Sequence, residues 1–376
     1  MSLAADVGQI LWFGFHGTVA PPELLAQITA GEVGAVVVFK RNLVINVVHG
    51  PVPQEVVDLA ALVALDQSLH AAVPTGSLPV LVCIDQEGGV VQRVRAPATQ
   101  WPPMLSLDGH PAPMDAALAE DVGLAIGREL TAMGFDLDFA PVLDVHTNPA
   151  NPIIGDRAFG RDPQTVTRRA LAFARGLDRG GVIPCGKHFP GHGDTVTDSH
   201  LVLPRVEHDR ARLEAVELAP FAAAAKAGVP VLMTAHVVYP ALDPDRPATL
   251  SPAILTDLLR GQLGYRGVIL SDDLDMRAIV DHGGVGDAAV AAVRAGCDAL
   301  LLCRDPAHQV TAREALLAAA AGDASLRGRI AEAAERVRDL KASHGRRRAA
   351  EPAPGLDVVG AIEHRHLADR LAGTAA

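Results

Sequence analysis

One segment of this sequence combines acidic and basic side chains in a spacing that could transfer protons. The residues from Lys187 to His200 read KHFPGHGDTVTDSH and directly follow an apolar stretch. In an extended loop, side chains two positions apart point the same way, so Asp198 can accept a hydrogen bond from one nitrogen of His200. That pairing would fix the imidazole tautomer and raise its basicity, leaving the other nitrogen to exchange protons near neutral pH. A simple surface turn is the alternative for Asp198-Ser199-His200.

Lys187 and His188 continue the apolar stretch, so we expect them at the end of a buried strand. A buried lysine needs a carboxylate partner or a substrate oxygen. Lys187 therefore either contacts a ligand or forms an internal ion pair, for example with Asp85 or Asp272.

The histidines at 188 and 192 are four residues apart, a spacing that can bind zinc when it falls on a helix. Pro190 and its neighbouring glycines exclude a helix here, and no HExxH pattern is present. We therefore expect no metal and no cofactor, and we expect His192 to brace the loop.

Asp272 directly follows the apolar stretch Val268-Ile269-Leu270-Ser271. A carboxylate held on a buried strand is fixed in position, as a catalytic nucleophile requires. Asp273 should point to the opposite side by alternation and act as a cap or a brace. A helix N-cap is the alternative for either aspartate.

Further charged residues follow other apolar stretches, notably Asp85, Arg93 and Arg157. If these stretches are parallel strands, their polar ends meet at one face and form a charged pocket. Hydrolysis of a carbohydrate needs such parts: a nucleophile, a proton donor and charged groups that hydrogen-bond several hydroxyls. Arg–Asp bridges across the pocket rim are the alternative for Asp85, Arg93 and Arg157.

The elements that would hold these residues alternate between strand-like and helix-like stretches. The predicted strands are 10–15, 35–39, 78–84, 135–145, 182–185, 229–234, 268–270 and 299–302. Between them lie helix-like stretches, including 53–70, 115–133 and 163–179. This alternation predicts an α/β fold, a single (β/α)8 TIM-like barrel with a C-terminal helical tail. A doubly wound open sheet is less favoured, because no GxGxxG motif follows the first strand.

We expect residues 1–345 to form the catalytic barrel, and residues 346–376 to form a basic, Pro-rich linker with a docking helix near its end. The net charge of −11 argues against nucleic acid or anionic membrane as a partner. The four cysteines have neither CxxC nor metal-site spacing, and no signal peptide or membrane span is evident, so we expect a cytoplasmic protein. We also expect it to be a monomer.

Several motifs together resemble glycoside hydrolase family 3, and most closely its bacterial β-N-acetylglucosaminidases (β-hexosaminidases). The motifs are DQEGGxVxR at 85–93, FAPVLDV at 139–145, GDRAFG at 155–160, KHFPGHGDTxxDSH at 187–200, MTAH at 233–236 and GVILSDDL at 267–274. The long histidine motif is the most specific of them. The tail past Arg346 matches nothing in the family.

The resemblance implies a role for each matched residue. Asp272 would be the nucleophile of a retaining double displacement, His200 the general acid/base, and Asp198 the residue that orients it. The remaining matched residues would hold the hydroxyls of the sugar: Asp85, Arg93, Arg157, Lys187 and His188. The implied substrate is a small carbohydrate, a GlcNAc-containing muropeptide or disaccharide from peptidoglycan.

Three other functions remain open at this point. A phosphorylase could use the same residues, because a histidine acid/base repels an incoming phosphate less than a carboxylate would. A catalytically silent sugar-binding barrel is a second possibility, although it would be expected to lack Asp272 or His200. A metal-dependent barrel hydrolase is the third.

Overall fold

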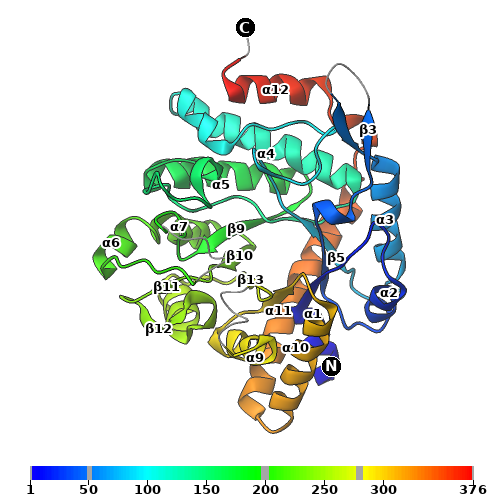
Figure 1. Cartoon of the computed structure of the whole chain (residues 1–376), viewed down its shortest axis with the longest axis vertical. Helices are drawn as coiled ribbons and strands as arrows, with labels where there is room; N and C mark the ends of the chain where they lie inside the picture. Colours follow the sequence, from blue (N-terminus) through cyan, green and yellow to red (C-terminus); the bar gives the residue numbers. More distant parts are fainter. Residues whose placement is uncertain (1, 49–52, 196–202, 277–282, 375–376) are drawn as a thin grey trace.

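The structure, a computed structural model, describes residues 2–48, 53–195, 203–276 and 283–374, and within them eight parallel strands form a closed barrel (Figure 1). The strands lie in the order β1-β14-β13-β10-β9-β8-β5-β2 around the barrel. Their bounds are β1 Leu11–Gly14, β2 Ala35–Val38, β5 Leu81–Ile84, β8 Leu137–Asp138, β9 Ile183–Phe189, β10 Val231–Thr234, β13 Val268–Asp273 and β14 Ala299–Leu302. The predicted barrel is confirmed, with one strand in or overlapping each predicted range, and its closure excludes the open sheet.

Helices connect and cover the strands. Their bounds are α1 Leu3–Ile10, α2 Pro22–Thr29, α3 Leu59–Ala71, α4 Met114–Met133, α5 Pro163–Arg179, α6 Arg210–Ala215, α7 Ala219–Ala227, η5 Ala253–Gln262, α9 Val285–Ala295, α10 Pro306–Ala321, α11 Ala324–Ala350 and α12 Ile362–Ala372. Single-turn helices are η1 Lys40–Asn42, η3 Gly155–Arg157, η4 Ala248–Leu250 and η6 Leu356–Val358, and η2 Met104–Gly109 is slightly longer. No helix in these ranges is long and apolar enough to cross a membrane.

Three short antiparallel strand pairs lie in the loops outside the barrel. They are β3 Ile45–Val48 with β4 Gln54–Val57, β6 Gln86–Gly88 with β7 Val91–Gln92, and β11 Val238–Tyr239 with β12 Asp243–Pro247. The first pair corrects the helix predicted over 53–70. Val56 and Val57 are β-branched and pair with Asn46 and Ile45, so the chain is extended there. The helix starts only after Asp58, whose carboxylate caps it by accepting from the Ala61 N–H at 3.0 Å.

The barrel interior is filled by alternate residues of the strands. Leu81 and Cys83 of β5, Ile183 and Cys185 of β9, and Val268 and Leu270 of β13 all belong to one buried apolar cluster. Because side chains of a strand alternate between its two faces, the next inward positions are residues 85, 187 and 272. The strands therefore carry Asp85, Lys187 and Asp272 to the C-terminal mouth of the barrel.

The opposite, N-terminal end of the barrel is closed by the long helix α11. Its Val337 is fully buried among the interior residues of the barrel, and Leu340 packs against them. Lys341 is also buried, and its ammonium group donates to Gln9 Oε1 at 2.8 Å. This end of the barrel is therefore packed rather than open.

Two buried aspartates fasten α11 to the strand entrances. Asp136 precedes β8 and Asp298 precedes β14, and each accepts a backbone N–H of the adjacent strand, from Val82 and Ile269 respectively, at 2.9 Å. Their side-chain partners are His70, His344 and Arg348 for Asp136, and Arg260, Arg329 and Arg336 for Asp298. Most of these partners lie on α11, so the helix is held by charge as well as by apolar contact.

The chain after α11 returns to the outside of the barrel. In Figure 1, α12 (red) lies along α4, near the C-terminal end of the chain. We placed the end of the catalytic domain at residue 345, and helix α11 continues past this position to Ala350. The domain boundary stays a prediction.

Candidate active site

A cavity of about 570 Å³ opens at the C-terminal mouth of the barrel. Six of the predicted site residues line it: Asp85, Arg93, Arg157, Lys187, His188 and Asp272. The other two, Asp198 and His200, lie outside the described residues. The barrel thus brings together side chains from β5, β9 and β13 and from the loops that follow them.

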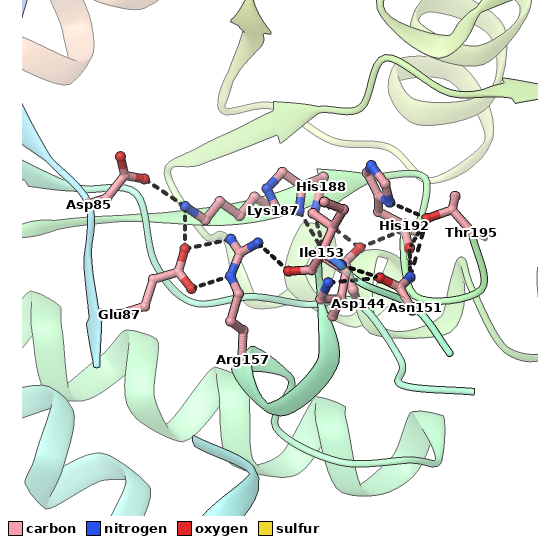
Figure 2. A network of polar contacts seen from close by, with 12 residues as sticks. Asp85, Glu87, Asp144, Asn151, Ile153, Arg157, Lys187, His188, His192 and Thr195 are labelled. Atoms are coloured by element: carbon pink, nitrogen blue, oxygen red, sulfur yellow. Dashed lines mark hydrogen bonds and ion pairs between the residues drawn. The ribbon is translucent and has the colours of Figure 1, made fainter. Parts of the chain in front are cut away.

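A network of ion pairs forms one wall of the cavity (Figure 2). Lys187 Nζ donates to Asp85 Oδ1 at 2.9 Å and lies 2.6 Å from Glu87 Oε1. Arg157 makes a two-pronged contact with Glu87, through Nε at 2.8 Å and Nη2 at 2.7 Å. Arg93 Nη2 donates to the second oxygen of Asp85 at 2.8 Å. The internal ion pair considered for Lys187 is therefore present, and so is the Arg93–Asp85 bridge.

These pairings decide the charge of each group. Burial alone would favour the neutral forms, but Asp85 and Glu87 hold the pKa of Lys187 above its ordinary value. Likewise burial opposes ionisation of Asp85, yet Lys187 and then Arg93 hold its pKa well below the usual range. The wall thus offers fixed charges of both signs, which suits hydroxyl groups because each one both donates and accepts.

His188 is oriented by a buried carboxylate that follows the strand-like stretch at 139–143. Its Nδ1 lies 2.7 Å from Asp144 Oδ2, and its backbone N–H also points to Asp144. Asp144 stays ionised because the favourable contact with His188 outweighs its burial and lowers its pKa. A carboxylate at Nδ1 requires the proton there, so Nε2 is the nitrogen left for a ligand.

His192 lies at the stem of the segment that carries Asp198 and His200. Its backbone N–H donates to Asp144 Oδ1 at 2.6 Å, and its carbonyl accepts from Asn151 Nδ2 at 2.9 Å. The hydroxyl of Thr195 lies 2.8 Å from His192 Nδ1. These contacts give His192 the bracing role that we predicted (Figure 2).

Asp272 lies at the end of β13 and faces the same cavity. One of its oxygens accepts the N–H of Asp273 at 2.7 Å, and within the described part of the chain it forms no ion pair. Burial opposes its ionisation, but His236 and His188 nearby hold its pKa below the ordinary value. It is therefore an ionised carboxylate held on a rigid strand.

Asp273 lines the same cavity, lies 3.6 Å from Arg304 Nε through its Oδ2, and braces the backbone. Its Oδ1 accepts from the N–H groups of Asp275 and Cys303, both at 3.1 Å. Burial, with Asp275 as a second cause, raises its pKa to about 7. The pKa values of the two adjacent aspartates are thus shifted in opposite directions, and both side chains line the cavity rather than facing opposite sides as alternation predicted.

Sequence reasoning missed two residues that hold this site together, Glu87 and Asp144. Glu87 lies two positions after Asp85, so the alternation rule places both on one side and could have found it. Asp144 is fully buried at the end of an apolar stretch, where an unpaired carboxylate would be costly. That cost could have indicated a histidine partner, but nothing in the sequence says which one.

The described residues contain no group of three or more His, Cys, Asp or Glu side chains arranged to hold a metal ion. The rings of His188 and His192 lie 5.8 Å apart edge to face. The His188 ring is engaged by Asp144 and the His192 ring by the Thr195 hydroxyl, so the pair serves to shape the pocket wall.

Comparison with known proteins agrees with this geometry. Residues 5–340 match the model of the glycosyl hydrolase family 3 N-terminal domain. The chain is 41% identical over 299 residues to a beta-hexosaminidase from Chromobacterium violaceum, covering 79% of this chain and 78% of that one. It is 39% identical over 300 residues to beta-hexosaminidase A from Pseudoalteromonas piscicida, covering 76% of this chain but only 48% of the relative. The chain therefore spans about half the length of that relative.

Solved structures give the same result. A family 3 beta-N-acetylglucosaminidase from Paenibacillus superposes with a TM-score of 0.86 at 37% identity, covering 100% of this chain and 69% of the other. NagZ from Neisseria gonorrhoeae, in complex with N-trifluoroacetyl-D-glucosamine, superposes with a TM-score of 0.77 at 31% identity and covers 98% of both chains.

Proposed function

Because this chain belongs to glycosyl hydrolase family 3 and is a glycoside hydrolase, we propose that it is a retaining exo-β-N-acetylglucosaminidase. Its substrates would be peptidoglycan-derived fragments that end in GlcNAc. The names of the beta-hexosaminidase relatives and the glucosamine derivative bound to NagZ support the choice of an N-acetylated amino sugar. A cytoplasmic location agrees with four buried cysteines that all remain free thiols.

The observation that carries the proposal is the contrast between Asp272 and the other carboxylates of the cavity. Asp85 and Glu87 are each bound by two cations, whereas Asp272 is ionised and forms no ion pair in the described ranges. A nucleophile must be charged, rigid and available, and Asp272 meets all three conditions. The paired carboxylates are better suited to hold a substrate than to attack it.

The paired wall would bind the terminal sugar. The vicinal hydroxyls of a pyranose both donate and accept hydrogen bonds, and the alternation of Arg93, Asp85 and Lys187 offers a partner of each kind. His188 adds a ring nitrogen whose orientation is fixed by Asp144. Such a wall fixes the anomeric carbon relative to Asp272, which is how positioning lowers a reaction barrier.

The proposed reaction has two displacements at the anomeric carbon. In the first, an Asp272 oxygen attacks, the bond to the leaving oxygen breaks, and His200 gives that oxygen a proton. In the second, His200 takes a proton from water, the water oxygen attacks, and the Asp272 carboxylate leaves. The configuration is therefore retained. Asp198 would hold His200 in the required tautomer.

Hydrolysis of 4-nitrophenyl N-acetyl-β-glucosaminide, measured beside the β-glucoside, tests the proposed substrate. We expect release from the amino sugar only, and NMR should show the β-anomer as the first product. Equal release from both sugars, or an α-anomer first, would contradict the proposal. Repeating the assay with added phosphate separates hydrolysis from phosphorolysis, because only the latter forms N-acetylglucosamine 1-phosphate.

Replacement of His200 tests the proton-transfer role. His200→Ala should slow hydrolysis of a disaccharide by about a hundredfold or more. The loss should be much smaller for an aryl glycoside with a good leaving group, because such a group needs little protonation. An equal loss on both substrates would remove His200 from the acid role.

A further inference from the structure

We infer that the C-terminal segment, residues 355–372, positions Arg93 in the sugar-binding wall by way of the buried carboxylate of Glu129. This segment lies outside the range 5–340 that matches the family model. Its kinetic consequences rest on the proposed function, since they concern binding of the terminal sugar.

Glu129 of α4 is the junction between the C-terminal segment and the loop after β7. It is only 2% exposed. Its Oε1 accepts from the Gly360 N–H at 3.0 Å and lies 2.8 Å from His364 Nδ1. The same carboxylate accepts from Thr99, through the hydroxyl at 2.6 Å and through the backbone N–H at 3.2 Å. One buried carboxylate therefore ties the two segments together, and removing a donor from either leaves it undersatisfied.

Thr99 is linked in turn to the backbone that carries Arg93. The side chain of Gln92 donates to the carbonyls of Thr99 at 2.8 Å and Val94 at 3.0 Å. Gln86 accepts from the Arg93 N–H at 2.9 Å. Arg93 itself follows the two-residue strand β7 and belongs to no barrel strand. Its position therefore depends on these side-chain contacts rather than on the barrel ladder.

The C-terminal segment also fits the loop sterically. Gly360 has a φ of +68°, and a Cβ there would come within 2.0 Å of the Pro97 carbonyl oxygen, so only glycine allows this approach. The ring of His364 lies against the buried Trp101, with centroids 6.4 Å apart. The segment is thus seated on residues 97–101, a few positions along the chain from Arg93, which lines the cavity.

Loosening the loop should disturb the contact between Arg93 and Asp85. Arg93 is a positioned group whose Nη2 is 2.8 Å from Asp85, and a shift of about 1 Å would break this geometry. A loosened loop should therefore weaken sugar binding more than it slows the chemistry at Asp272, which is held separately on β13.

The test compares two histidines of the same helix. His364→Ala removes a donor to Glu129, whereas His366→Ala changes an exposed histidine two positions later. We expect His364→Ala to raise KM for the aryl amino-sugar substrate about fivefold, with kcat changed by less than about twofold, and His366→Ala to change neither. His364→Asn should restore most of the affinity, because its amide nitrogen can replace Nδ1 as the donor to Glu129.

Hydrogen exchange of the peptide covering residues 89–101 gives a second readout that needs no activity. His364→Ala and Gly360→Ala should both accelerate this exchange, and His366→Ala should not. A lowered melting temperature with KM and exchange both unchanged would overturn the inference, because the segment would then act on stability alone. If the wild type fails to hydrolyse any amino sugar, the proposed function is wrong, and the exchange result still decides whether the segment positions the loop.

Discussion

Both ends of the barrel contain buried carboxylates, but the two ends differ in how these carboxylates are paired. At the N-terminal end, Asp136 and Asp298 each receive a backbone N–H and side-chain donors, mostly from α11. At the C-terminal end, Asp85 and Glu87 are likewise paired with cations, but Asp272 is left without an ion pair in the described ranges. One end is filled by a helix, and the other surrounds a cavity of about 570 Å³.

This difference shows how a buried charge can be assigned to stability or to chemistry. Buried carboxylates are costly unless they are paired, so their presence alone does not indicate function. At the N-terminal end, the carboxylates of Asp136 and Asp298 find their partners within the protein. At the cavity, a charged group faces open space, where a substrate can supply the missing partner. We therefore propose that Asp272, which forms no ion pair within the described ranges, is the reactive position.

We expect the greatest loss of activity from replacing Asp272. Asp272→Asn keeps the shape of the side chain but removes its charge, so turnover of the aryl amino sugar should fall by about a thousandfold or more. Thermal unfolding should change less than at Asp298, because Asp272 forms no ion pair within the described ranges and the Asn oxygen can still accept the Asp273 N–H. A variant that keeps more than about a tenth of the wild-type kcat would show that another group is the nucleophile.

The same kind of substitution at the N-terminal end of the barrel should lower stability and leave activity nearly unchanged. Asp298→Asn leaves three arginines facing a neutral amide, which should lower the free energy of unfolding by about 3–5 kcal/mol. Urea unfolding measures this loss, while kcat and KM of the folded protein should stay within about twofold of wild type. Loss of activity without loss of stability would contradict the division of roles between the two ends.

Protonation of Asp273 should make the stability of the protein depend on pH. Its pKa is raised to about 7, mainly by burial, from an ordinary value of 3.8. Between these two values the unfolded state loses its proton while the folded state keeps it, so this group makes stability fall as pH rises. Asp273→Asn should remove about 3–4 kcal/mol of that decline between pH 4 and pH 7. The difference between wild type and variant is the quantity to measure, and a flat difference would contradict the raised pKa.

Lys341, at the other end of the barrel, should show the opposite slope in another pH range. Burial lowers its pKa to about 7 from 10.5. Above pH 7 the folded state releases this proton before the unfolded state does, so stability should rise with pH. Lys341→Met should remove about 2–3 kcal/mol of that rise between pH 7 and pH 9. Lys226→Met, at an exposed lysine of α7, is the control and should leave the slope unchanged.

The sequence indicated the barrel and the strand ends because both follow from local alternation. Asp85, Lys187 and Asp272 each lie two positions beyond an inward apolar residue, so their common location was predictable. The helix predicted over 53–70 was wrong at its start, because Val56 and Val57 satisfy a helical pattern but are paired with a strand. Periodicity does not reveal such a partner.

The pairings within the site were beyond local reasoning. Glu87 contacts Lys187 and Arg157, which are far along the chain, and Asp144, in the loop after β8, contacts His188 of β9. The link from His364 to Glu129 joins residues 235 positions apart. Only the folded chain shows which charges are satisfied, and the roles of Asp198 and His200, outside the described residues, stay predictions.

Trapping the covalent intermediate would identify the nucleophile without relying on a rate. A fluorinated N-acetylglucosaminyl substrate that forms the intermediate quickly and loses it slowly would be incubated with the wild-type protein, and its peptides would be measured by mass spectrometry. We predict one added sugar on the peptide that contains Asp272, and none in Asp272→Asn. Label on another residue would contradict the assignment, and turnover of this substrate without any label would contradict the double displacement itself.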